Sequence, residues 1–423
     1  MPPAHPARRS APRSIPPNPL WLALALSMAA AVSLGVTRFA YGLLLPPMRD
    51  DLGWSYLLAG AMNTANALGY LLGALATPWL LKRLLPTQLM LYGAMLASLF
   101  MALSGFFTEA APLMLQRLLA GVASAFVFVC GGLLAARLAA SEPARSGFLL
   151  GLYYGGTGFG IVLSALLVPA VLQAAHGQAH GWVWTWWALA IACIAGCACL
   201  VWPASIFSTQ IRREQAAQRQ DAAQARVARP GSNQGPRRHF HWRDFSFALA
   251  SYFLFGVGYI GYMTFVIALI RQQGASPQEV TLFYSLLGVA VLLSARLWAG
   301  LLDRFKGGQA LSILSLLLGC ATMMPALTSL QPLVLASGIL FGAVFLSVVA
   351  STTALVRHNL PQAAWATGIS AFTVVFAAGQ IVGPTVCGWI SDGPGGLERG
   401  LVFSAIALWL GAILAWRQRA LGL

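Results

Sequence analysis

LWLALALSMAAAVSLGVTRFAYGLLLP, residues 20–46, is an apolar run that contains a single charged residue, Arg38. A helix needs about 20 apolar residues to cross the hydrocarbon core of a bilayer, so this run is long enough to span a membrane. It is too long for the apolar core of an export signal, and no small-residue cleavage site follows it. We therefore expect a retained membrane helix with an arginine inside it.

The whole chain has the composition of a membrane protein. Of its 423 residues, 58% are hydrophobic and 9% are charged, which is more apolar surface than a soluble domain of this length can bury. The sequence predicts an all-α membrane protein with twelve transmembrane helices in two groups of six. The expected spans lie at roughly 20–46, 55–81, 87–107, 111–136, 147–172, 181–203, 245–270, 279–302, 309–329, 332–356, 366–390 and 400–416.

One long polar segment separates the two groups of spans. We expect five regions: a disordered cytoplasmic tail at 1–19, a six-helix bundle at 20–203, a basic cytoplasmic linker at 204–243, a second six-helix bundle at 244–416 and a cytoplasmic tail at 417–423. The linker has two interpretations, an amphipathic helix on the anionic inner leaflet or a solvated connection.

Basic residues are distributed unevenly about the predicted spans. With the amino terminus in the cytoplasm, twenty of the 26 Lys and Arg residues lie on the cytoplasmic side, three lie in loops on the other side and three lie within spans. Cytoplasmic loops of membrane proteins carry such an excess. Topology therefore explains the net charge of +15, and we expect both termini in the cytoplasm and no nucleic-acid partner.

The two groups of spans show internal similarity. A shift of 221 residues lays LLKRLLPTQLM (80–90) over LLDRFKGGQAL (301–311), and places Tyr41 on Tyr262 and Gly121 on Gly342. A shift of 223 lays GTGFG (156–160) over GQIVG (379–383). Matches at nearly one offset indicate a duplicated six-helix unit.

These features resemble the major facilitator superfamily. The motifs that carry the resemblance are GALATPWLLKR (73–83), GLLDRFKGG (300–308), RLLAG (117–121) and GLYYGGTGFG (151–160). The opening RFAYGLLLPPMRDDLG (38–53) resembles the YbfB-like branch of bacterial members. The chain departs from the family pattern at Thr77, where Asp is usual, which puts the charge relay of that loop in doubt.

The resemblance implies a monomeric transporter of the bacterial inner membrane that binds a small-molecule substrate near the bilayer midplane. The site would lie between two bundles that rock to open alternately to each side. Protons are one candidate coupling ion. The expected gating and structural residues are Gly73, Lys82, Arg83, Gly121, Gly156, Gly160, Arg296, Asp303, Arg304, Gly379 and Gly383.

Three arginines fall within the predicted spans: Arg38, Arg117 and Arg296. Inserting such a charge costs about 2.5–3.5 kcal/mol, so each should face a wet cavity or a partner. For Arg38 and Arg117 two interpretations stay open, an anion site in a cavity or bracing of neighbouring helices. Arg296 lies seven residues before Asp303, near the inner end of its span, where we expect it to brace the inner gate.

Uncharged polar residues on neighbouring spans complete the expected cavity. The predicted substrate-binding set is Arg38, Tyr41, Asn63, Asn66, Arg117, Tyr259, Tyr262 and Gln380. All eleven Asp and Glu residues and all six His residues lie in loops, in tails or at span ends. Buried arginines without a buried carboxylate disfavour cationic substrates, because like charges repel strongly in a low dielectric.

The same distribution leaves no obvious proton relay inside the membrane. A proton-coupled cycle would need a carboxylate at a span end or a substrate that carries the proton, and anion exchange or facilitated diffusion are alternatives. No residue set for an enzyme falls within the spans, and the six cysteines lack metal-site spacing. We expect no cofactor and no metal.

The sequence thus favours a secondary active or facilitative transporter of a small organic solute, with an organic anion preferred. Two alternatives stay open. One is an efflux pump for amphipathic neutral or weakly charged compounds, and the other is a membrane sensor with the same fold that transports nothing.

Overall fold

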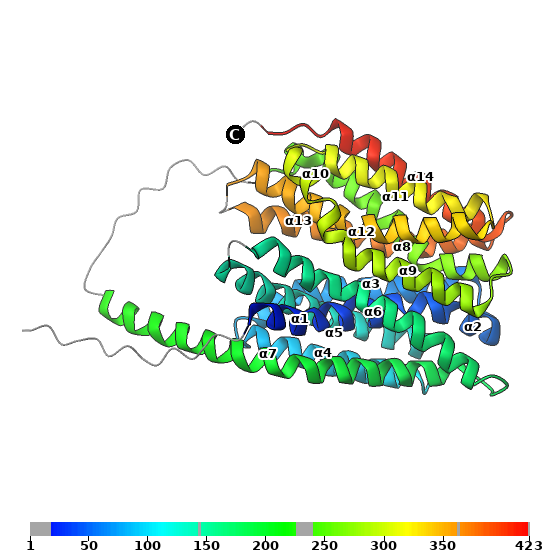
Figure 1. Ribbon diagram of the computed structural model, residues 1–423, viewed down its shortest axis with the longest axis horizontal. Helices are drawn as coiled ribbons and strands as arrows, with labels where there is room; N and C mark the ends of the chain where they lie inside the picture. The colour runs from blue at the N-terminus through cyan, green and yellow to red at the C-terminus, as the bar shows by residue number, and fades with distance from the viewer. Residues whose placement is uncertain (1–17, 143–144, 226–239, 362–363, 422–423) are drawn as a thin grey trace, which may run out of the picture.

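The structure is a computed structural model that describes residues 18–142, 145–225, 240–361 and 364–421 (Figure 1). The expected disordered tail lies almost entirely outside these residues, as do positions 226–239 of the expected linker. The described chain is nearly all helical, with long helices lying side by side along one direction (Figure 1). The predicted all-α class is confirmed.

The first half of the chain, α1 to α7, is a continuous series of helices. Its elements are α1 (Pro19–Ala30), the π-helix η1 (Ala31–Phe39), α2 (Tyr41–Leu52), α3 (Tyr56–Leu80), α4 (Pro86–Ser104), α5 (Ala110–Ser141), α6 (Ser146–Ala174) and α7 (Trp182–Ala225).

The second half, α8 to α14, follows a short 3₁₀ turn, η3 (Trp242–Phe245). Its elements are α8 (Ser246–Gln272), α9 (Pro277–Leu297), α10 (Ala299–Arg304), α11 (Gln309–Leu327), α12 (Gln331–Asn359), α13 (Trp365–Ser391) and α14 (Gly396–Arg417).

Eleven described segments are long and apolar enough to cross a membrane. Of the twelve expected spans, the one missing from this set is α3, which is a 25-residue helix in the structure. That length suffices to cross a bilayer, but Asn63 and Asn66 lower the apolar character of the helix. With α3 included, the structure has the expected twelve crossings.

The two halves repeat the same packing. In the first half α3 packs on α5, α4 on α7 and α1 on α6; in the second half α9 packs on α12, α11 on α14 and α8 on α13. Each pair occupies the equivalent place in its own half, which confirms the predicted pseudo-symmetric bundles. Between the halves, the main contacts are those of α6 with α9, α3 with α13 and α2 with α8.

A glycine and polar capping residues set the boundaries of α2, α3 and α9, helices that contact the other half. Gly53 ends α2 in the left-handed conformation, with φ of 64°, where glycine carries no steric penalty. Ser55 caps α3 by accepting a hydrogen bond from the Leu58 N–H at 3.1 Å. Ser276 and Glu279 form a capping box at the start of α9. These caps fix where α3 and α9 begin.

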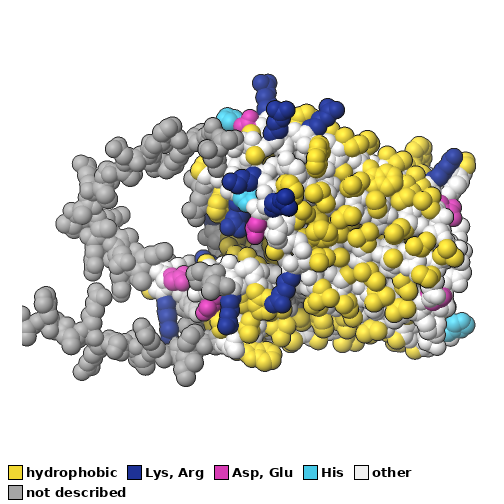
Figure 2. Space-filling model, turned by 45° about the horizontal axis from the view of Figure 1, so that its top comes forward, with side chains coloured by type: hydrophobic (Ala, Val, Ile, Leu, Met, Phe, Trp, Pro, Cys, Tyr) yellow, Lys and Arg dark blue, Asp and Glu magenta, His cyan; other side chains and the backbone are white. Residues whose placement is uncertain are grey.

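The exterior is that of a membrane protein. Hydrophobic side chains cover the flank seen in Figure 2, and Lys and Arg side chains gather toward one end. We call this end, which carries the starts of α1 and α8 and the end of α14, the terminal end, and the other the opposite end (Figure 1). A broad apolar flank between polar ends fits a lipid environment.

Three local features differ from the expected spans. The first span is not one regular helix but continues to Leu52 through a nine-residue π-helix. The α7 helix is 44 residues long and runs to Ala225, so the first part of the expected linker continues the helix of the sixth span. The eighth span ends at Leu297, and Trp298 separates it from the short α10.

Candidate functional site

The π-helix η1 places Arg38 near the middle of the first span. In a π-helix the hydrogen bonds run from i to i+5, and such segments are rare and frequently occur at functional sites. The Thr37 hydroxyl donates to the Val32 carbonyl at 2.7 Å, five residues back. Arg38 follows directly and is 3% exposed. The irregular helix thus holds a buried guanidinium between the two halves.

Arg38 is linked to the second half through two side chains. Its guanidinium donates to the amide oxygen of Gln380 on α13, and the Gln380 amide nitrogen donates to the Tyr259 hydroxyl on α8 at 2.8 Å. Its Cζ lies 5.6 Å from the centre of the Tyr70 ring. We call the chain of Arg38, Gln380 and Tyr259 the central bridge. The Nε of Arg38 is buried and has no hydrogen-bond partner among the described residues.

Arg117 on α5 is bound within the first half. It donates to the Thr37 carbonyl at 2.8 Å and to the side-chain oxygen of Asn63 at 3.2 Å, and it is 1% exposed. Asn63 in turn donates to the Thr264 hydroxyl on α8 at 2.7 Å. The backbone contact of Arg117 matches the bracing interpretation, while its neighbour Asn63 forms a second polar link between the halves.

The remaining predicted substrate-binding residues make hydrogen bonds inside their own halves. Tyr41 donates to the Ala59 carbonyl at 2.9 Å, and Asn66 donates to the Arg117 carbonyl at 2.9 Å. The Tyr262 hydroxyl shares a hydrogen bond with Ser337 at 2.7 Å. In this conformation their polar groups are therefore engaged in helix packing. By contrast, Arg38, Gln380 and Tyr259 meet where the halves face each other, and Asn63 makes a separate contact with Thr264 of the second half.

The expected gating glycines all lie where two helices of one half approach closely. A Cβ added at any of them would collide with backbone of the neighbouring helix, as at Gly156 against Ser27 of α1. The same holds for Gly73, Gly121, Gly160, Gly379 and Gly383. These glycines allow close helix packing within each half.

The charged motif residues lie exposed near the terminal end. They are Lys82, Arg83, Asp303 and Arg304, and none of them forms an ion pair within the described part of the chain. Arg296 is also exposed, with its Cζ 4.4 Å from the centre of the Phe148 ring on α6. No ion pair or hydrogen bond to Asp303 accompanies the bracing role that the sequence suggested for Arg296.

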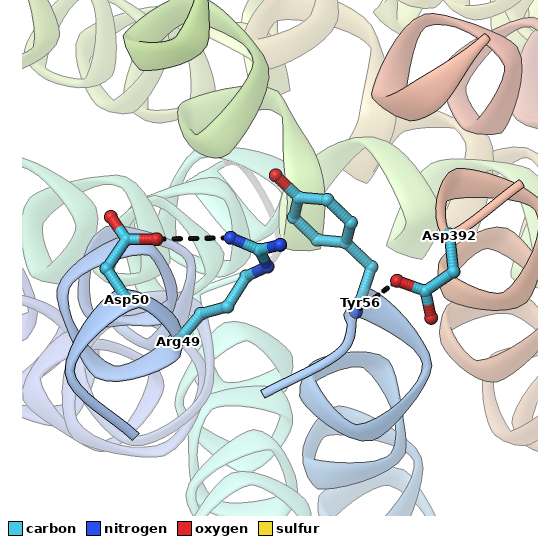
Figure 3. Close-up of polar contacts among 4 residues, drawn as sticks. All are labelled: Arg49, Asp50, Tyr56 and Asp392. Carbon is cyan, nitrogen blue, oxygen red and sulfur yellow. Dashed lines mark hydrogen bonds and ion pairs between the residues drawn. The ribbon is translucent and has the colours of Figure 1, made fainter. Parts of the chain in front are cut away.

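A polar clasp at the opposite end was not foreseen from the sequence. The Asp392 carboxylate, at the end of α13, accepts hydrogen bonds from the Tyr56 N–H at 2.7 Å and the Leu57 N–H at 2.8 Å. Arg49 pairs with Asp50 at 3.1 Å, and its Cζ lies 4.0 Å from the Tyr56 ring centre (Figure 3). We call the contact of Asp392 with the first turn of α3 the Asp392 clasp. It joins the halves at this end.

Further contacts between the halves were also missed. The Tyr284 hydroxyl of α9 donates to the Phe39 carbonyl at the end of η1, at 2.7 Å. A second group of glycines lies against backbone of the other half and comprises Gly42, Gly60, Gly158, Gly288 and Gly388. Glycines are abundant throughout the chain, so sequence alone could not separate those between the halves from those within one half.

The interior is positively charged where it is described. The three ion pairs among the described residues, Arg49 with Asp50, Arg137 with Glu214 and His180 with Asp51, lie away from the central bridge. Neither Arg38 nor Arg117 has a carboxylate partner in that part of the chain. No group of His, Cys, Asp and Glu there could hold a metal ion. The arrangement can attract and hydrogen-bond an anion.

Two tyrosines of the first half, Tyr154 and Tyr70, are only partly covered. Tyr154 of α6 is packed among the rings of Phe128 and Tyr153, yet 41% of its surface is exposed. Tyr70, which faces Arg38, is half-buried. The side chains of Tyr154 and Tyr70 are therefore only partly covered by the described residues.

Comparisons with known proteins agree with this architecture. The family model described as the uncharacterised MFS-type transporter YbfB matches residues 30–416. No curated protein matches the chain by sequence.

Two solved structures have the same fold. A bacterial homologue of the human lysosomal transporter Spinster, inward-facing and unoccupied, has a TM-score of 0.67 and 16% identity, over 95% of this chain and 97% of that one. The nucleoside transporter NupG has a TM-score of 0.64 and 13% identity, over 95% of this chain and 100% of that one. Identities this low show the shared fold alone.

Proposed function

The chain belongs to the family of uncharacterised YbfB-type MFS transporters, and we propose that it carries a small organic anion between its two halves. The observation that supports this most directly is Arg38. It is buried near the middle of a span, it faces the other half, and its guanidinium is not neutralised by any described carboxylate. A charge held in a low-dielectric interior attracts an opposite charge strongly.

Gln380 suggests how the anion would bind. Arginine has five N–H donors and binds carboxylates in a forked, two-bond geometry. Among the described residues, Arg38 has a single hydrogen-bond partner, the neutral amide oxygen of Gln380. A carboxylate forms a stronger, charge-assisted bond and would take the place of Gln380. Since Gln380 belongs to the other half, binding the anion would also release the central bridge.

Alternating access is supported by the different states of the two ends. The Asp392 clasp and the close approach of Gly60 to Pro384 hold the halves together toward the opposite end. The exposed Tyr154 lies on the terminal-end side. We propose that the terminal end faces the cytoplasm of a bacterial inner membrane, because the basic residues gather there. The conformation would then be open to the inside.

A second candidate, efflux of amphipathic compounds, is favoured by an aromatic stack beside the bridge. The rings of Phe255, Tyr259 and Phe376 are stacked, with centroids 4.9 to 5.5 Å apart. Such a surface suits a planar apolar group. The two candidates are separated by the charge of the compounds that compete for transport.

The test is anion uptake in proteoliposomes by purified full-length protein, with benzoate, lactate and succinate as probes and tetraethylammonium and glycerol as cationic and neutral probes. The expected result is flux of at least one anion, reduced about tenfold or more in Arg38→Gln. One hydrogen bond to a charged group contributes about 1.5–3 kcal/mol.

Arg271→Gln is the matched control, because Arg271 is exposed at the end of α8. It should leave flux unchanged. Equal anion flux in wild type and a folded Arg38→Gln variant would contradict the anion site, and transport of the cation or neutral probe alone would favour efflux of amphipathic compounds.

A further inference from the structure

A large groove opens on the side of the molecule, apart from the central bridge. It lies between the halves, where α1, α6 and α7 of the first half face α9 of the second, and its volume is about 1090 Å³. This is slightly above the roughly 300–1,000 Å³ typical of small-molecule sites. Its wall includes Trp21, Leu24, Phe148, Phe159, Trp202 and Leu293.

The groove exists because small residues form its floor. On α6 the residues Gly147, Gly151 and Gly155 face it, so no side chain fills the space between α1 and α9. The rim is apolar and open to the surroundings: Trp21 is 62% exposed and Leu293 is 64% exposed. A surface of this kind on a membrane-spanning segment faces hydrocarbon, so an apolar chain is its natural occupant.

One charged residue is part of the groove wall. Arg296 lies in the last turn of α9, toward the terminal end, and its side chain is exposed. Its Cζ is 4.4 Å from the Phe148 ring centre, which directs the guanidinium across the groove toward α6. Within the described part of the chain it has neither an ion-pair partner nor a hydrogen bond. A positively charged side chain therefore lies at the terminal end of an otherwise apolar groove.

We infer that this groove binds an anionic phospholipid from the leaflet at the terminal end. The phosphate accepts hydrogen bonds from Arg296, and an acyl chain lies along the glycine floor of α6. Charge complementarity selects the headgroup, since arginine near the membrane surface attracts anionic lipids. The apolar wall of the groove favours a lipid over a soluble anion, because Arg296 is the one charged residue in the described lining.

The bound lipid would touch both halves of the protein. The groove wall contains Phe148 from α6 and Leu292 from α9, and next to it these helices meet at Gly158 and Gly288. A rocking motion of the halves changes the distance between α6 and α9. The lipid therefore binds the conformation described here more tightly than one in which the groove is closed, and so favours it.

The experiment measures lipid affinity by native mass spectrometry and thermal stabilisation of the full chain. The probes are phosphatidylglycerol and phosphatidylcholine with identical acyl chains. The wild type should prefer phosphatidylglycerol, and Arg296→Gln should reduce that preference about fivefold, the effect of one basic residue near a membrane surface. The control Arg304→Gln, an exposed arginine of the neighbouring helix α10, should keep it.

A second variant tests the acyl chain separately from the headgroup. Ala25→Trp on α1 fills the groove from the opposite wall and should weaken binding of both lipids without changing their ratio. Preserved phosphatidylglycerol preference in Arg296→Gln, or an equal loss in Arg304→Gln, would overturn the site. Unchanged affinity in Ala25→Trp would overturn the acyl-chain position.

Discussion

At the scale of single residues, the two buried arginines differ in what surrounds them. Arg117 satisfies a backbone carbonyl and an amide oxygen of its own half, whereas Arg38 contacts one exchangeable side chain of the other half. If the Arg117 guanidinium turned toward a ligand, the Thr37 carbonyl would lose its hydrogen-bond donor. We therefore propose a structural role for Arg117 and the anion contact for Arg38.

The structural role of Arg117 predicts a loss of stability in Arg117→Met. The Thr37 carbonyl and the Asn63 side chain would each lose a donor, at a cost of about 1–3 kcal/mol for each buried group. The melting temperature should fall by several degrees in a fluorescence-detected unfolding scan. Arg271→Met, at an exposed position, serves as the control. A fully stable Arg117→Met variant without anion flux would instead place Arg117 in the substrate site.

For single residues, the sequence predicted which charged side chains lie inside the membrane but not which groups they contact. An arginine inside residues 20–46 is visible from hydropathy alone. Its acceptor, Gln380, lies 342 residues away, and that contact exists because the two halves meet there. Both residues were among the eight predicted substrate-binding residues, but the sequence did not show which of the eight contact one another.

At the scale of helices, the Asp392 clasp is a helix-terminus contact between the halves. Two backbone N–H groups at the start of α3 have no partner within the helix, and a carboxylate at this position is favoured by the helix dipole. Asp392 supplies it from α13. The start of α3 is therefore capped in part by a side chain of the other half.

Asp392→Ala should shift the protein toward conformations open at the opposite end. Loss of about 1–2 kcal/mol changes a two-state ratio by a factor of roughly 5–30. Spin labels at Glu109 and Glu398, exposed residues of the two halves, should show a larger long-distance fraction by electron paramagnetic resonance. Asp50→Ala is the control, because Asp50 pairs with its neighbour Arg49 (Figure 3). Identical distance distributions in wild type and Asp392→Ala would show that the clasp does not hold this end.

Helix positions followed from the sequence, whereas their irregularities did not. The spans could be located from the sequence because crossing the lipid requires an apolar length that changes little between helices, although α3 is less apolar than the others. The π-helix at Ala31–Phe39 differs from an α-helix by the register of its backbone hydrogen bonds, and side-chain patterns do not encode that difference. The carbonyls of Thr37 and Phe39 near its end accept hydrogen bonds from Arg117 and Tyr284, so tertiary contacts accompany the irregularity.

At the scale of the whole molecule, the duplicated architecture was predictable and the conformation was not. The offset near 221 residues between the halves predicted equivalent bundles, and the paired helix contacts confirm it. Which end is closed depends on a few contacts between the halves, such as the Asp392 clasp and Gly388 against Tyr56. The same helices run through both ends, so composition alone does not indicate which end is closed.

The charge distribution predicts the orientation of the whole molecule. A reporter of cytoplasmic location fused after Arg419 should be active, and alkaline phosphatase inserted near Gly177, in the turn between α6 and α7, should be active on the other side. The reason is the excess of Lys and Arg at the terminal end. Phosphatase activity at the carboxyl terminus, with none at Gly177, would reverse the topology and the direction of opening.

The length of α7 makes it a suitable site for a label that reports conformational change. From Trp202, which borders the groove, to Glu214 the helix extends by about 18 Å at 1.5 Å per residue, and Glu214 pairs with Arg137 of α5 at 3.5 Å. We therefore expect this segment of α7 to move together with the first half. With a fluorophore on an Arg213→Cys variant and its energy-transfer partner on the second half, the distance between the two halves could be followed in single molecules. Neither label would block the path of the substrate.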